Sequence, residues 1–251
     1  MRRVPVPDRR RASRKAALAV TALVVAVAAV AGWLWSRTLP QRASDQVRAV
    51  LAAMVEDPAG LEVTLASRPG LALLAGRIDR LEVSGRGLQA GEIRAERFRL
   101  YGEDMRVDLA ASAREGRLVV SSARRLEMEL VLSERALNDY LQRKGQLAGL
   151  LRVRLTPQGP RLELETSVHD EVVSLGLDGR LVVEPGNVVA LVPDRLSIER
   201  DGTPALSLDV AGAPGALRVP LGTLPVPVVI ERLETGEGQL RVWGRHRPAA
   251  P

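Results

Sequence analysis

The sequence predicts a β-rich α+β protein with one N-terminal transmembrane helix, followed by a large antiparallel sheet with about two covering helices. Three observations predict this class. A long uncharged apolar run lies near the N-terminus, about twelve later segments alternate between apolar and polar residues, and only two later segments have helical periodicity. The chain has 251 residues, of which 46% are hydrophobic and 26% charged, so it is long enough to form a sizeable core.

The net charge of +6 is confined to a basic arm at residues 1–15. This arm contains seven arginines and lysines and one aspartate, whereas the rest of the chain carries equal numbers of basic and acidic side chains. The charge of the main domain therefore gives no evidence for a nucleic-acid partner. Aromatic residues make up only 2% of the chain, which is too few for a surface that stacks bases.

Residues 16–35 form the apolar run and contain no charged side chain. At ~1.5 Å per residue, a helix of this length spans the ~30 Å hydrocarbon core of a bilayer. Because the preceding arm is basic, the positive-inside rule places the N-terminus in the cytoplasm and residue 36 onward outside. Trp33 and Trp35 end the run and are expected to anchor the helix at the membrane interface. The sequence thus predicts a single-pass protein of the cell membrane.

A cleaved signal peptide is the alternative interpretation of this run. Residues 26–28 and 29–31 both read Ala-Val-Ala, which fits the small-residue rule for cleavage. We expect an uncleaved anchor, because the run is longer than the ~7–15 apolar residues of a signal peptide. Under either interpretation, the main domain lies outside the cytoplasm.

The rest of the chain is expected to contain a linker at 36–43, an extracytoplasmic domain at 44–244 and a flexible tail at 245–251. Helical periodicity predicts an amphipathic helix over residues 44–56 and a second helix over 133–148. A serine opens each of these two segments in the position of an N-cap.

Nearly every other segment of the domain alternates between apolar and charged residues, as in antiparallel strands with one buried and one wet face. These segments are 61–65, 81–83, 106–109, 126–130, 161–165, 172–177, 180–184, 188–192, 195–199, 206–210, 216–219, 228–233 and 239–243. Hairpin turns are predicted at 114–116, 178–179, 184–187, 201–202 and 237–238.

Two helices are too few to cover the broad apolar face of such a sheet. Either the sheet rolls on itself, or two sheets form a sandwich, or a lipid supplies the missing apolar contact. The inward positions are mainly Leu, Val and Ala, which suit flexible acyl chains and an ordinary protein core equally well.

The sequence contains no recognisable catalytic motif, and we predict no catalytic, cofactor-binding or metal-binding residue and no cofactor. Cysteine is absent, which excludes disulfides, thiolate metal sites and cysteine nucleophiles. His169 and His246 are the only histidines. In a strand, His169 and Asp170 point to opposite faces, and no Gly-x-Ser-x-Gly motif occurs. A lipid hydrolase that depends on His169 and Asp170 is therefore the third hypothesis.

A leucine-rich segment at 67–76 is unusual for a loop, because loops normally expose polar residues. Leu71, Leu73 and Leu74 lie between glycines and need cover. They either pack under the sheet, insert into a bilayer, or cap the mouth of an apolar cavity.

The order of these features resembles the LmeA family of bacterial cell-envelope phospholipid-binding proteins. The resemblance begins with the helix at 44–56 and the strand at 61–65 and covers about residues 44–244. It is carried by the Pro, Leu and Gly-Arg pattern of 68–83, the strand-to-helix segment 132–138, the Pro- and Leu-rich segment 217–230 and the last strand at 238–244. Ile78 stands where an aromatic residue is common in the family.

The resemblance implies an elongated, curved antiparallel sheet with an apolar groove and a role in envelope lipid or glycolipid biogenesis or transport. It implies a phospholipid or envelope glycolipid and the membrane as partners, and it supplies no catalytic residue. Leu71, Leu73, Leu74 and Ile78 are the candidate contacts with lipid or membrane. No protein partner is indicated. The alternative function is a non-catalytic envelope scaffold or interaction domain with a self-packed β core.

Overall fold

The computed structural model describes residues 52, 55, 60–67, 72, 75–115, 117–144, 150–168, 171–200, 203–213, 215, 217–222 and 224–247. The apolar run at 16–35 and most of the helix expected at 44–56 lie outside these residues. Within the described part of the chain, no helix has the length and apolar character needed to cross a membrane.

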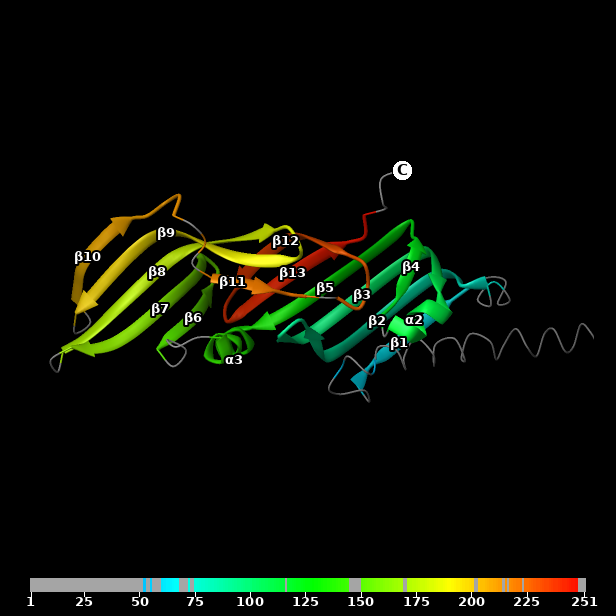
Figure 1. Ribbon diagram of the computed structural model, residues 1–251, viewed down its shortest axis with the longest axis horizontal. Coiled ribbons are helices and arrows are strands. Elements are labelled where there is room, and N and C mark those ends of the chain that lie inside the picture. Colours follow the sequence, from blue (N-terminus) through cyan, green and yellow to red (C-terminus); the bar gives the residue numbers. More distant parts are fainter. Residues whose placement is uncertain are drawn as a thin grey trace, which may run out of the picture.

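The strands form two antiparallel sheets that follow one another along the long axis of the molecule (Figure 1). Sheet A has the order β1-β2-β3-β5-β13-β12, and β4 also pairs with β3. Its strands are β1 (Glu62–Ala66), β2 (Arg77–Ala90), β3 (Ile93–Asp108), β4 (Val119–Ser122), β5 (Arg125–Ser133), β12 (Val229–Gly236) and β13 (Gln239–Arg245). Because strands from both ends of the domain pair in sheet A, its assembly depends on contacts distant in sequence.

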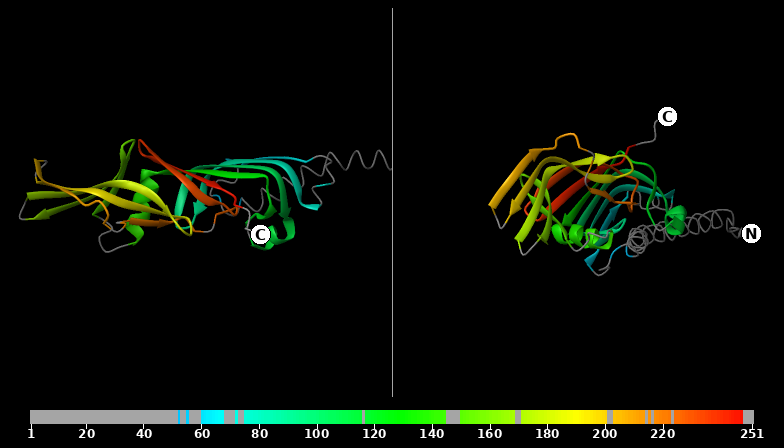
Figure 2. Two further views of the ribbon diagram at one scale, coloured as in Figure 1. Left: turned by 90° about the horizontal axis from the view of Figure 1, so that it is seen from above. Right: turned by 60° about the vertical axis from the view of Figure 1, so that its left-hand side comes forward.

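Sheet B is built from one continuous stretch of chain and has the order β10-β9-β8-β7-β6, with β11 also paired to β9. Its strands are β6 (Leu151–Thr156), β7 (Gly159–Val168), β8 (Glu171–Glu184), β9 (Val188–Arg200), β10 (Thr203–Asp209) and β11 (Leu217–Pro220). Two helices with described bounds accompany the sheets, α2 (Leu109–Glu115) and α3 (Glu134–Lys144). Helix α3 lies near the point where the sheets meet (Figure 1). Figure 2 shows that the long strands of both sheets are curved.

The antiparallel, β-rich class with two helices is thus confirmed, although α2 is not one of the two predicted helices. The single sheet expected from the sequence is two sheets. β4 and β6 were not among the predicted strands. The helix predicted at 133–148 is α3, which is described to Lys144. The turns at 184–187 and 237–238 do join neighbouring strands, whereas residues 201 and 202 lie outside the described part.

Two predicted hairpin turns are wrong. The segment at 114–116 belongs to the end of α2 as far as Glu115; Asp108 starts this helix by accepting a hydrogen bond from the Ala111 N–H at 2.8 Å. The Asp178-Gly179 pair lies inside β8, where the register with β9 shifts. A Cβ atom on Gly179 would lie 2.2 Å from the Val192 carbonyl oxygen, so this glycine permits close strand contact at a bulge.

The apolar face of sheet A is covered by the protein itself. Its buried side chains include Leu81, Val83, Phe98, Leu100, Met128, Leu130 and Val242. Part of the cover is a segment that we call the strap, residues 221, 222 and 224–228. Leu221, Leu224, Val226 and Val228 of the strap are each at most 4% exposed and belong to the same core cluster. Sheet A therefore fills its own apolar face.

Residues beyond the predicted domain end also help to hold the strap. Arg245, which the sequence placed in the tail, is the last residue of β13. The backbone N–H of His246 donates to the Leu126 carbonyl at 2.9 Å, and a ring nitrogen of His246 lies 2.8 Å from the Pro227 carbonyl oxygen.

Asn187, at the turn between β8 and β9, connects sheet B to the strap and to sheet A. Its side-chain amide donates to the Val228 carbonyl at 3.0 Å, and its side-chain oxygen accepts from the Ile230 N–H at 3.0 Å. Its own carbonyl accepts from the Leu221 N–H at 3.1 Å. Asn187 has a φ of 59°, a left-handed conformation that asparagine tolerates better than most residues.

The edge of sheet B is joined to α3 in a similar way. Asn138 of α3 donates to the Val153 carbonyl at 2.9 Å and accepts from the Val153 N–H at 2.7 Å. Glu134 accepts from the Leu155 N–H at 2.8 Å. Since β6 is an edge strand, these side chains satisfy backbone groups that would otherwise have no sheet partner.

Replacement of Asn187 by alanine is expected to lower the free energy of unfolding by about 2–3 kcal/mol. The variant loses two partly buried hydrogen bonds and places a Cβ-bearing residue without a local polar group in the left-handed region. Asn187→Gly is the control, because it retains the backbone conformation and should lose only about 1–2 kcal/mol. Denaturant unfolding checks both values, and an alanine variant as stable as the wild type would contradict this role.

Asn138→Leu is expected to lower the free energy of unfolding by about 2–4 kcal/mol, because the N–H and carbonyl of Val153 are left without partners. Gln142→Leu is the matched control: it removes an amide from an exposed position of the same helix and should change stability by less than about 0.5 kcal/mol. Equal effects of the two substitutions in denaturant unfolding would show that the contact with β6 is unimportant.

Candidate functional site

Two rows of aliphatic side chains cross sheet B from edge to edge. Directly paired residues of an antiparallel sheet share a face, so the strand register identifies each row. One row is Val153, Leu162, Leu177, Leu196 and Leu208, and the next is Leu151, Leu164, Leu175, Ile198 and Leu206. We call these ten side chains the aliphatic face.

Cover over the aliphatic face decreases from β6 to β10. Val153 on β6 is only 3% exposed, whereas Leu206 and Leu208 on β10 are 45% and 46% exposed. The remaining members of both rows are partly exposed. Soluble proteins rarely leave a contiguous apolar surface of this kind uncovered, and such surfaces mark sites of interaction.

The opposite face of sheet B is polar. Arg161 of β7 makes ion pairs with Asp178 and Glu199, each at 3.2 Å, and with Glu163 at 3.3 Å. Arg161 also donates to the Ser197 hydroxyl at 3.0 Å. Because charged side chains suit this face to water, the aliphatic face is the side of sheet B that exposes apolar surface.

The aliphatic face continues toward α3 into a small apolar void. Leu181 lies on the same face as Leu177, four residues further along β8, and pairs with Leu191. The void has a volume of about 20 Å³ and is lined by Leu137, Val153, Leu155, Pro160, Leu181, Val189, Leu191, Leu217, Val219 and Leu240. It is too small for an acyl chain, so the space for a long apolar ligand lies on the exposed part of the aliphatic face.

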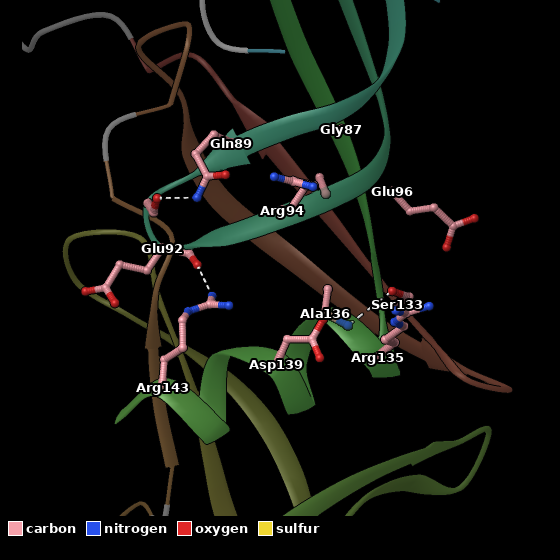
Figure 3. Close-up of a pocket in the computed structure, with 12 residues that line it drawn as sticks. Gly87, Gln89, Glu92, Arg94, Glu96, Ser133, Arg135, Ala136, Asp139 and Arg143 are labelled. Atoms are coloured by element: carbon pink, nitrogen blue, oxygen red, sulfur yellow. Dashed lines mark hydrogen bonds between the residues drawn. The ribbon is translucent and has the colours of Figure 1, made fainter. Parts of the chain in front are cut away.

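A polar cavity of about 690 Å³ lies on the other side of α3, beside the hairpin of β2 and β3 (Figure 3). It contains three arginines and three carboxylates, namely Arg94, Arg135, Arg143, Glu92, Glu96 and Asp139. Arg143 donates to the Glu92 carbonyl at 2.7 Å, and Lys144 pairs with the Glu92 carboxylate at 2.5 Å. The hydrogen bond to Glu92 raises the pKa of Lys144. Mixed charge suits this cavity to a polar group rather than to an acyl chain.

A second polar cavity, of about 530 Å³, lies on the outer face of sheet A. Arg232 lies over the ring of Trp243, 3.9 Å from its centroid, and Arg125 lies 5.2 Å from the ring centroid of Tyr101. Arg125 also donates to Glu127 at 2.7 Å, and this hydrogen bond lowers the pKa of the Glu127 carboxyl. Both aromatic rings are therefore paired with a guanidinium group.

Most of the site residues predicted from the sequence lie outside the described part of the chain. These are Leu71, Leu73, Leu74, Trp33 and Trp35, together with His169 and Asp170 of the hydrolase hypothesis. Ile78 is described; it pairs with Met105 and is 1% exposed in the core of sheet A.

The residues of the aliphatic face were not singled out from the sequence, although their alternation predicted the strands that carry them. The periodicity shows which side chains share a face, but not whether another part of the chain covers that face. Among the described residues, no group of three or more His, Asp or Glu side chains is arranged to hold a metal ion.

A family model described as LmeA-like phospholipid-binding matches residues 36–245. The chain belongs to this family. The matched range contains both sheets and all ten residues of the aliphatic face, and it confirms the resemblance found in the sequence. No curated protein and no solved structure matches the chain. Membership of the LmeA-like family supports a phospholipid as the ligand.

Proposed function

We propose that this LmeA-like protein is a membrane-anchored, extracytoplasmic phospholipid-binding protein that holds acyl chains on the aliphatic face of sheet B. The observation that carries the proposal is the uncovered aliphatic face in a chain of a phospholipid-binding family. The role is binding rather than catalysis, and it serves envelope lipid or glycolipid biogenesis or transport.

The dimensions of the aliphatic face support an acyl chain as its occupant. Five strands about 4.8 Å apart span roughly 19 Å from β6 to β10. One leaflet of a bilayer has a hydrocarbon thickness of roughly 15 Å, so a single acyl chain of that reach extends over about four of the five strands. Each methylene group removed from water contributes about 0.8 kcal/mol, and the exposed leucines gain cover at the same time.

Anchoring and location rest on the N-terminal sequence. The basic arm at 1–15 and the apolar run at 16–35 support a helix that crosses the membrane with the domain outside the cytoplasm. A tether of this kind keeps the aliphatic face close to a source of lipid. Trp33 and Trp35 would then lie at the outer interface.

The alternative is an envelope scaffold, and the self-filled sheet A favours it. A domain of two such sheets would need no lipid and would use its polar faces for a protein partner. The lipid-binding function predicts lipid bound to sheet B, and the scaffold function predicts none.

Leu206→Asp/Leu208→Asp is expected to remove bound lipid from the protein. Two carboxylates on the most exposed part of the aliphatic face would have to lose water when an acyl chain binds. Full-length wild type and variant are purified in parallel from native membranes, and their lipids are extracted and identified by mass spectrometry. The wild type should carry a phospholipid or glycolipid, in about one copy per chain, that the variant lacks.

Val172→Asp is the matched control, because Val172 is a 40% exposed apolar residue on the opposite face of the same sheet. It should retain the lipid, and lipid held by the N-terminal segment should be equal in all three proteins. Equal lipid content in the wild type and the double variant would refute binding on sheet B and support the scaffold function.

A further inference from the structure

The outer face of sheet A carries a group of arginines that form no ion pair with the other described residues. In the strand register, Arg86 of β2 pairs with Arg97 of β3, Arg97 pairs with Val131 of β5, and Val131 pairs with Arg241 of β13. Arg99 lies in the next row on the same face, two residues along β3. We call Arg86, Arg97, Arg99 and Arg241 the arginine patch.

Glu129 lies directly opposite Arg99, and Glu234 lies directly opposite Arg241. No ion pair joins either carboxylate to these arginines, and none of the four arginines of the patch makes an ion pair in the part of the chain that the structure describes. Further along the same face, in contrast, Arg125 and Arg245 both bond to Glu127, at 2.7 and 3.0 Å. Like charges placed directly opposite each other, as in Arg86 and Arg97, destabilise a sheet. The Arg86–Arg97 pair is therefore an unfavourable arrangement that an anionic partner would relieve.

The patch is held on a rigid support. Val131 points to the outer face and is not part of the core cluster, yet it is only 7% exposed. Its direct neighbours across the strands are Arg97 and Arg241, whose aliphatic stems are placed to cover it. Stems fixed in this way leave the guanidinium groups exposed and partly ordered, which favours bidentate contact with phosphate.

Trp243 lies next to the patch. Arg99 pairs with Glu129, and Glu129 pairs with Trp243, so the three side chains form one row across the sheet. A tryptophan ring with an amphipathic character prefers the headgroup zone of a bilayer. Arginines and a tryptophan on one sheet face combine the positive charge and the interfacial side chain that suit an anionic phospholipid membrane.

We infer that the arginine patch docks the domain onto a bilayer that contains anionic phospholipids. Docking uses the outer face of sheet A, whereas the proposed acyl-chain site is on sheet B. The inference rests on the proposed function only because both assume that the protein works at a membrane. Docking through sheet A and acyl-chain binding on sheet B can each be disproved without the other. Each arginine at an anionic surface strengthens docking roughly fivefold.

The chain itself provides a reporter, because Trp33, Trp35 and Trp243 are its three tryptophans. In full-length protein with Trp33→Phe and Trp35→Phe, fluorescence comes from Trp243 alone. This protein is placed in vesicles that contain lipid with a nitroxide at the headgroup, in phosphatidylcholine with or without phosphatidylglycerol. Quenching of Trp243 is expected with phosphatidylglycerol, and at 1 M salt, where the Debye length is about 3 Å, it should disappear.

Arg97→Gln/Arg241→Gln in this background should lower the ratio of docked to undocked protein by roughly 25-fold. Arg152→Gln/Arg195→Gln is the control: it removes the same charge from exposed positions of sheet B and should leave quenching unchanged.

Lipid extracted from the patch variant should equal that of the wild type, which separates docking from acyl-chain binding. Equal quenching in both kinds of vesicle, or equal loss in both double variants, would overturn the inference. Binding of a soluble anionic polysaccharide without quenching in vesicles would overturn it as well.

Discussion

An open antiparallel sheet has one apolar face that must be covered, and this constraint governs the whole molecule. Sheet A satisfies it internally, since the strap places Leu221, Leu224 and Val226 against its core. Among the described residues, sheet B has no equivalent cover near β10, where Leu206 and Leu208 remain nearly half exposed. The same architecture thus contains one sheet whose apolar face is buried as a protein core and one whose apolar face is only partly buried.

The difference between the sheets depends on how they are joined. Asn138 and Glu134 of α3 bind the edge of β6, and Asn187 binds both ends of the strap from the β8–β9 turn. These hydrogen bonds fix sheet B by its β6 side and by this turn, while β10 stays at the far edge. A lipid on the aliphatic face would therefore meet a rigid, preformed surface, and little protein ordering would oppose its binding.

The sequence predicted the strands and the class of fold because alternation is a local signal, and it placed the turn at 184–187 correctly. The turn predicted at Asp178-Gly179 is wrong, because Gly179 lies within β8 and allows the close approach of the Val192 carbonyl. The sequence could not divide the strands into two sheets, because β5 pairs with β13 over more than one hundred residues of sequence. The sequence could not predict the exposure of Leu206 and Leu208 either, because tertiary structure decides which face of a sheet is covered.

Photo-crosslinking tests the central claim most directly. Full-length protein is incubated with a phospholipid that carries a diazirine within its acyl chain, irradiated, and digested for mass spectrometry. Acyl chains on the aliphatic face predict adducts on peptides of β7 to β10, around Leu164, Leu175, Ile198 and Leu206. Adducts confined to the strap and the core of sheet A, or to residues 16–35, would contradict binding on sheet B.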